Sequence, residues 1–372
     1  MLVVKAVKQN ISEDTKTEIS SLLETFRWMV NEAVRVGLEK NITSRFSLSN
    51  EVYHRLNEYG LHTWYNLSAI EVATSILKNY RKIVRKKRNV KKPYAKRLMA
   101  KIGNQAYKIV DGKLRLPIEP GQYIYIPLNR YTLKILSEPN LKLGSITLTA
   151  STVSISFSKE TAEIEPCGYI GIDTNLNNVT IALSNGEISA YDLSTATRIK
   201  VAYREVKRHF KRSDVRIGRQ LFRKYGEKQR NKVNQILHHV SKEIVKKAKE
   251  KKFAIVMENI KGIRKLYRKG NGQGREYRSR LNSWSFHELQ RQIEYKAKWE
   301  GVKVVYLDAR ETSANCSICG SKTYLNERLL WCPKCQVSID RDVNAARNIL
   351  ARALRFGAVG QPVEGMIAEC VS

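Results

Sequence analysis

The chain has 372 residues, 42% of them hydrophobic, and carries 67 Lys and Arg against 35 Asp and Glu, a formal net charge of +32. At roughly 150 residues per domain, this length predicts two or three domains. So large a charge repels itself in a compact protein, so it favours a polyanionic partner, with nucleic acid ahead of an acidic membrane surface. No apolar run reaches the ~20 residues of a membrane span, and the first ten residues are unlike a signal peptide, which predicts a cytoplasmic protein without a membrane partner.

The first 166 residues alternate between strand-like and helical patterns. Residues 1–9 are apolar enough for a strand, and apolar side chains then recur at helical spacing as far as Arg88. From Asn104 the period changes to two, with Asp111-Gly112 as a hairpin turn. We therefore expect a β-domain that is split by a helical insertion, with the β-domain at residues 1–10 and 102–166 and the insertion at 11–101.

The second half of the chain has the element order of an RNase H-like fold: three strands, then helix, strand, helix, strand and helix. The predicted strands cover residues 169–173, 179–183, 188–191, 253–257 and 302–307, and the predicted helices include 284–299 and 343–354. The sequence thus predicts a mixed α/β domain at residues 167–311 and 339–356, followed by a tail at 357–372.

Acidic residues close two of these predicted strands. Asp173 ends Tyr-Ile-Gly-Ile-Asp, Glu258 ends Phe-Ala-Ile-Val-Met-Glu, and Asp342 stands at the start of the last helix. If the strands are adjacent, their carboxylates share one small volume and repel one another unless cations neutralise them. Hard oxygen ligands suit Mg²⁺ or Mn²⁺, and two such ions can support phosphodiester hydrolysis. Each acid alone is more often a turn residue, and Asp340 either competes with Asp342 for the third position or caps the helix.

Two Cys-x-x-Cys pairs, separated by twelve residues, lie before the last helix. They comprise Cys316, Cys319, Cys332 and Cys335. This spacing lets two knuckles close a tetrahedral thiolate site around Zn²⁺. A site of four cysteines has no open position for a substrate, so we expect a structural zinc ribbon at residues 312–338.

Basic residues concentrate in two segments. From Arg81 to Lys101 the chain has eleven basic residues and no acid, and from Arg198 to Lys232 it has fourteen basic residues and three acids. Such density of one sign favours a surface that follows phosphates over a merely solvated helix face. The residues that we expect to contact nucleic acid are Arg81, Lys82, Arg85, Lys86, Lys87, Arg88, Arg208, Lys211, Arg212, Arg216 and Arg219.

With these residues in place, the chain resembles the TnpB (OrfB) family of insertion-sequence proteins and, more distantly, the type V CRISPR nucleases. The resemblance covers about residues 169–355, and the first half of the chain matches only in its element order. The matching motifs are Gly-Ile-Asp-Thr-Asn-Leu-Asn-Asn at 171–178, Met-Glu-Asn-Ile-Lys-Gly at 257–262, Leu-Asn-Ser-Trp-Ser-Phe-His-Glu-Leu-Gln at 281–290, Ile-Glu-Tyr-Lys-Ala-Lys-Trp-Glu-Gly at 293–301, Thr-Ser-Ala-Asn-Cys-Ser-Ile-Cys-Gly at 312–320 and Asp-Arg-Asp-Val-Asn-Ala-Ala-Arg-Asn-Ile-Leu at 340–350.

The resemblance implies a RuvC-like nuclease in which Asp173, Glu258 and Asp342 supply the three catalytic acids and the zinc ribbon precedes the third. It also implies a wedge-like N-terminal β-domain with a helical recognition insertion. Family members bind a transposon-derived guide RNA and cut target DNA, and base pairing selects the target. The implied function is a transposon-encoded RNA-guided DNA endonuclease with structural Zn²⁺ and catalytic Mg²⁺ or Mn²⁺, of unknown oligomeric state.

Two other functions fit parts of the sequence. A non-catalytic nucleic-acid-binding regulator of transposition would need only the zinc ribbon and the charge, and the three acids in RNase H-like element order speak against it. A transposase acting directly on transposon ends could use an RNase H-like core. Such enzymes usually show Asp, Asp and Glu in chain order, while here the order is Asp, Glu, Asp.

Overall fold

The structure is a computed structural model that describes residues 2–86, 90–210, 215–260, 262–263, 272, 274–282, 284–308 and 314–355. The chain divides into two compact units, an N-terminal unit of Leu2–Glu160 and a C-terminal unit that begins at Thr161. The predicted tail at 357–372 lies outside the described residues. None of the described helices combines the length and the apolar content needed to cross a membrane.

Two antiparallel sheets form the frame of the N-terminal unit. The larger sheet contains, in spatial order, β1 (Leu2–Asn10), β7 (Thr152–Glu160), β6 (Lys142–Thr149) and β2 (Met99–Ile102). The smaller sheet contains β3 (Lys108–Val110), β4 (Lys113–Pro117) and β5 (Tyr123–Pro127). Asp111 and Gly112, both with positive φ, make the predicted turn between β3 and β4. The prediction that the first strand pairs with the later β-rich segment is confirmed.

The helices of this unit are α1 (Lys16–Glu39), α2 (Arg45–Leu56), α3 (Trp64–Val84) and α4 (Arg130–Leu136). Phe26 of α1 packs edge-to-face against Tyr65 of α3, and the Tyr65 hydroxyl donates to the Pro117 carbonyl at 2.7 Å. We did not predict α2 or α4. Both begin at a polar cap, since the side chains of Ser44 and Asn129 accept hydrogen bonds from backbone amides of the first turn.

A five-stranded mixed sheet is the centre of the C-terminal unit. Its strands are, in spatial order, β10 (Ile188–Asp192), β9 (Asn178–Leu183), β8 (Gly168–Thr174), β11 (Phe253–Asn259) and β12 (Val304–Asp308). β9 is antiparallel to both of its neighbours, β10 and β8, while β8, β11 and β12 are parallel. The predicted order of three strands, helix, strand, helix, strand and helix is present in the structure.

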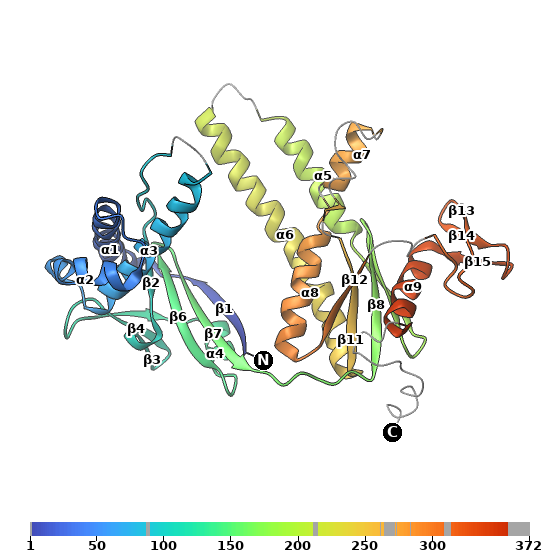
Figure 1. Cartoon of the computed structure of the whole chain (residues 1–372), viewed down its shortest axis with the longest axis horizontal. Helices are drawn as coiled ribbons and strands as arrows, with labels where there is room; N and C mark the ends of the chain where they lie inside the picture. Colours follow the sequence, from blue (N-terminus) through green and yellow to red (C-terminus); the bar gives the residue numbers. More distant parts are fainter. Residues whose placement is uncertain are drawn as a thin grey trace. The chain divides into compact units, whose positions relative to one another are not determined.

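Helices cover both faces of this sheet (Figure 1). The helices of the unit are α5 (Ser194–Arg208), α6 (Val215–Glu250), α7 (Arg275–Asn282), α8 (Phe286–Glu300) and α9 (Arg341–Arg355). On one face, alternate apolar residues of β8 and β11, such as Ile170 and Ile255, pack under α6 and α8. On the other face, Tyr169 and Val256 pack against α9.

A small antiparallel sheet precedes α9 and carries one of the four cysteines of the predicted zinc ribbon, Cys332, while Cys335 lies in the connection between its last two strands. Its strands are β13 (Tyr324–Asn326), β14 (Leu329–Cys332) and β15 (Val337–Asp340). β15 leads directly into α9, so the ribbon and the last helix are continuous in the chain.

Candidate active site and zinc ribbon

The central sheet brings Asp173 and Glu258 to the same edge. β8 and β11 are parallel neighbours in a register that pairs Ile172 with Met257, so the next residues along both strands are the two acids. Because side chains alternate between the faces of a strand, Asp173 shares a face with Tyr169 and Gly171, and Glu258 shares a face with Val256. Both acids therefore lie on the face of the sheet that α9 covers.

A glycine lets α9 approach this face closely. A Cβ at Gly171 would lie 2.5 Å from the backbone oxygen of Ala346 and 2.7 Å from the backbone nitrogen of Leu350, so only a glycine fits at this crossing without movement. Asp342 lies one helical turn before Ala346, and Asp173 lies two residues beyond Gly171. The close contact therefore brings the start of α9 toward the strand end that carries Asp173.

The pKa of Asp173 depends on the other two acids. Burial raises the pKa of the Asp173 carboxyl to about 7, and the neighbouring charges of Glu258 and Asp342 raise it too. The hydrogen bond from the Asn175 amide, 2.6 Å from Oδ2, and the charge of Arg341 act in the opposite direction. Asp173 thus interacts electrostatically with both other acids that the sequence singled out.

Asp340 and Asp342 have different partners. Oδ1 of Asp340 accepts hydrogen bonds from the backbone amides of Asp342 and Val343, so Asp340 caps α9, as the sequence left open. Oδ2 of the buried Asp342 accepts 2.8 Å hydrogen bonds from the Asn178 side-chain amide and from the Arg328 guanidinium. Arg328 lies between β13 and β14, in the ribbon. We did not predict this arginine, because nothing in the spacing of the ribbon points from Arg328 to Asp342.

The three carboxylates are arranged more loosely than the four cysteines. Within the described part of the chain, the cysteines are the one group of three or more potential ligands whose atoms all lie within 4.8 Å of one another. Like charges repel, and Asp342 is turned toward Asn178 and Arg328, so the acids are held apart. Three half-buried or buried carboxylates that repel one another are nevertheless the donor set that suits Mg²⁺ or Mn²⁺.

The cysteine cluster has the donor set and the compactness of a closed zinc site. Cys316 and Cys332 are buried, and the sulfurs of Cys319 and Cys332 are 3.5 Å apart. Hydrogen bonds from Ser321 hold the pKa of the Cys319 thiol below its usual range, whereas the neighbouring thiols raise that of Cys335. Four thiolates can hold one Zn²⁺ tetrahedrally and leave no position for a substrate, which is the arrangement of a structural site.

The predicted nucleic-acid contacts lie in both units. Arg81 lies in the last turn of α3 and donates to Asn41 and Thr43, so part of its guanidinium ties the end of α3 to the segment between α1 and α2. Exposed basic side chains lie at and just beyond the end of α3 and around the α5–α6 connection, namely Lys82, Arg85, Lys86, Arg208, Arg216 and Arg219. Lys87, Arg88, Lys211 and Arg212 lie outside the described residues.

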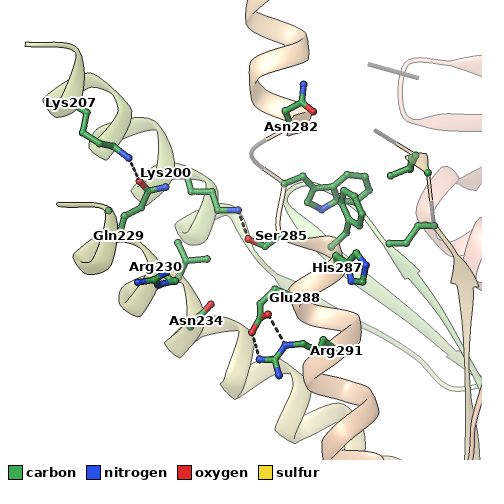
Figure 2. Close-up of a pocket in the computed structure, with 17 residues that line it drawn as sticks. Lys200, Lys207, Gln229, Arg230, Asn234, Asn282, Ser285, His287, Glu288 and Arg291 are labelled. Carbon is green, nitrogen blue, oxygen red and sulfur yellow. Dashed lines mark hydrogen bonds and ion pairs between the residues drawn. The ribbon is translucent and has the colours of Figure 1, made fainter. Parts of the chain in front are cut away.

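A cavity of about 870 Å³ in the C-terminal unit adds further basic side chains (Figure 2). On one side α5 and α6 present Lys200, Lys207 and Arg230, and on the other side Trp284 and Phe286 lie edge-to-face with ring centroids 4.7 Å apart. Lys207 donates to Gln229 at 2.7 Å, and Lys200 donates to Ser285. Burial lowers the pKa of the Lys200 ammonium to about 8. The basic side chains of this cavity suit a ligand with phosphates, whereas the ring of Phe286 is buried.

Comparisons with known proteins find similarities in both halves of the chain. The Cas12f1-like TNB domain matches residues 286–349, and the uncharacterized protein MJ0013 family matches residues 22–117. TnpB-like protein MJ0751 of Methanocaldococcus jannaschii is 29% identical over 281 residues, which is 70% of this chain and 98% of that relative. A putative RNA-guided DNA endonuclease of Streptomyces pristinaespiralis is 29% identical over 52% of this chain and 47% of its own.

A solved structure extends the likeness to the fold of almost the whole chain. Cas12f1, solved in complex with sgRNA and target DNA, matches with a TM-score of 0.59 at 16% identity, over 91% of this chain and 83% of the Cas12f1 chain. The mixed α/β fold is therefore that of the small Cas12-type nucleases. Within this class, the chain is similar to the TnpB-like proteins and to the type V nucleases. The resemblance drawn from the motifs of the sequence is confirmed.

Proposed function

We propose that this protein is a transposon-encoded RNA-guided DNA endonuclease that uses Asp173, Glu258 and Asp342 to bind Mg²⁺ or Mn²⁺. The observation that carries the proposal is the convergence of β8, β11 and α9, which gives one sheet edge three acids and raises the pKa of Asp173 through burial and its acidic neighbours. Relatives named RNA-guided DNA endonuclease and Cas12f1 support the reaction class. The sheet order supports an RNase H-like, RuvC-type core.

Divalent cations, when bound here, would supply an activated water and stabilise the leaving oxygen of the phosphodiester. The residues of the chain do the rest. Carboxylate oxygens of Asp173, Glu258 and Asp342 would hold the ions, and the repulsion among the three acids would then be offset. Asp340 keeps the start of α9 capped, so that Asp342 is held in the first turn of a rigid helix. Arg328 gives Asp342 a nearby positive charge.

The partners in this proposal are a guide RNA and target DNA. Basic side chains of α3, α5 and α6 supply phosphate contacts that do not depend on sequence, while base pairing selects the target. In domain terms, we propose a wedge-like β-domain at residues 1–10 and 102–166, a helical recognition domain at 11–101, a nuclease domain at 167–311 and 339–356, and a structural zinc ribbon at 312–338.

The test is cleavage of target DNA by the full chain purified with its co-expressed RNA, in Mg²⁺, against a library of adjacent motifs. We expect Asp173→Ala to abolish cleavage and to retain RNA binding, because only the ligation of the ions is lost. A matched pair of variants tests which aspartate, Asp340 or Asp342, is the third catalytic acid. Asp342→Asn should abolish cleavage, whereas Asp340→Asn should cut normally, because asparagine caps a helix as well as aspartate does.

Each alternative has its own outcome in the same assay. Cleavage at the wild-type rate by Asp173→Ala would falsify the proposed site. Binding without cleavage by the wild-type protein, for every motif in the library, would favour a non-catalytic regulator of transposition. Strand-transfer products from transposon ends in the absence of RNA would favour a transposase.

A further inference from the structure

One short loop contacts two of the three candidate catalytic acids. Residues 175–177 connect β8 to β9. Asn175 is the first residue of this connection, and Asn178, which directly follows it, is the first residue of β9. The side-chain amide of Asn175 donates to Oδ2 of Asp173 at 2.6 Å, and that of Asn178 donates to Oδ2 of Asp342 at 2.8 Å. Asp342 is 164 residues away from Asn178 in the chain. A single hairpin thus orients a carboxylate on a strand and a carboxylate on the last helix.

The loop is itself held by hydrogen bonds to its backbone. The backbone amide of Asn175 donates to the backbone carbonyl of Asn178 at 2.9 Å, which closes the loop. All three carbonyls of residues 175–177 then accept hydrogen bonds from outside the loop: from the Trp284 indole at 2.9 Å, from the Thr197 hydroxyl at 3.0 Å and from the Leu193 amide at 2.6 Å. The backbone beside Asn175 and Asn178 therefore has little freedom to move their side chains away from Asp173 and Asp342.

We propose that Asn175 and Asn178 are positioning residues that orient Asp173 and Asp342 for binding divalent cations, and that Trp284 fixes the loop that carries them. The inference rests on the proposed function. Asn175 and Asn178 are uncharged, so each can orient a carboxylate that binds metal without adding a charge to the site. Each asparagine contacts Oδ2 of its aspartate. Partners of metal ligands generally matter, since their loss costs roughly 10- to 100-fold in metal affinity or activity.

The test compares Asn175→Ala and Asn178→Ala with Asn177→Ala, which alters the exposed side chain of the same loop. Mn²⁺ binding to the full chain is measured by electron paramagnetic resonance without nucleic acid, and the Mg²⁺ concentration for half-maximal cleavage is measured in the RNA complex. We expect the first two variants to weaken Mn²⁺ binding about 10- to 100-fold and to shift the Mg²⁺ requirement in parallel. Asn177→Ala should match the wild type.

Trp284→Phe is the second arm, because phenylalanine retains a ring against Phe286 and removes the indole donor. We expect a smaller shift in the same direction, with little change in melting temperature. A purely structural role would lower the active fraction at every Mg²⁺ concentration and leave the half-maximal concentration unchanged.

The outcomes separate this inference from the proposed function. If Asp173→Ala loses Mn²⁺ binding while Asn175→Ala and Asn178→Ala bind it as Asn177→Ala does, the inference is overturned and the metal site stands. If Asp173→Ala binds Mn²⁺ like the wild type, the metal site is refuted, and the positioning role with it.

Discussion

Asp173 and Asp342 show how the same side chain acquires different properties from its surroundings. Asp173 is half-buried beside other acids, and its pKa rises to about 7. Asp342 is buried, and an arginine and an amide both donate to one of its oxygens. At the scale of single residues, the site therefore combines one acid that holds its proton near neutral pH with one acid that has a cationic neighbour.

The raised pKa of Asp173 predicts that metal binding depends on pH. A proton and a cation compete for the same carboxylate, so the apparent Mn²⁺ affinity of the free protein should fall about tenfold per pH unit below 7 and level off above it. Mn²⁺ titrations between pH 5.5 and 8.5 measure this dependence, with RNA binding at each pH as the control for folding. An affinity that stays flat between pH 5.5 and 6.5 would contradict it.

At the scale of elements, the crossing of β8 and α9 determines where Asp342 lies. Gly171 provides the space for this crossing, because the backbone of Ala346 and Leu350 occupies the position that a Cβ would take. The neighbouring ribbon is attached to the same helix. Asn344 of α9 accepts a hydrogen bond from the Ser317 amide and donates to the Asn315 carbonyl, each at 2.8 Å. The ribbon and the acid Asp342 are thus mechanically linked through one helix.

Gly171→Ala should therefore destabilise the protein and disturb the site together. We expect the free energy of unfolding to fall by about 1–3 kcal/mol, because overpacked contacts of this kind shift the backbone, and we expect Mn²⁺ binding to weaken. Denaturant unfolding and Mn²⁺ titration are the measurements. Gly218→Ala on α6 is the control, because its new Cβ meets no atom within 4 Å. Since alanine favours a helix over glycine, this variant should be as stable as the wild type or slightly more stable, and its Mn²⁺ binding should be unchanged. Equal behaviour of the two variants would refute the close crossing.

Cys332→Ser should release zinc and loosen the ribbon. Zinc binding contributes folding energy to such sites, so we expect substoichiometric zinc and a melting temperature several degrees lower. The docking of the ribbon on α9 also predicts weaker cleavage. Elemental analysis and thermal unfolding are the checks, and Lys334→Ala, an exposed change inside the same knuckle, is the control. Full zinc content in Cys332→Ser would be incompatible with a four-thiolate site.

At the scale of the whole molecule, the excess of positive charge is shared by both units. Exposed basic residues end α3 in the N-terminal unit and flank the α5–α6 connection in the C-terminal unit. A net charge of +32 is costly in an isolated protein, and release of counterions from a nucleic acid offsets that cost.

This distribution predicts a steep dependence of RNA affinity on salt. The logarithm of the association constant should fall linearly with the logarithm of salt concentration, by about 0.7–0.9 for each neutralised phosphate. Replacing Lys82, Arg85 and Lys86 with glutamine should reduce the slope by up to about 2–3 and leave folding intact, because all three side chains are exposed. Filter binding at several salt concentrations measures the slope. A slope equal to that of the wild type would show that these three residues do not contact the RNA.

Local patterns in the sequence determined much of the architecture. Strand ends at Asp173 and Glu258, the turn at Asp111-Gly112 and the two cysteine knuckles are each encoded within a few neighbouring residues, so they can be read without coordinates. The pairing of the first strand with the later β-segment was predicted as well. α2 and α4 were missed because they are short and depend on single polar caps.

Only the tertiary structure decided how the acids are surrounded. Asp340 and Asp342 are two residues apart and equally acidic, yet one caps α9 and the other meets Asn178 and Arg328. Likewise, no residue near Asn175 in the chain predicts the hydrogen bond that the Trp284 indole donates to the Asn175 carbonyl. Periodicity encodes which face of a strand or helix is buried, whereas contacts between residues more than a hundred positions apart arise only when the elements pack.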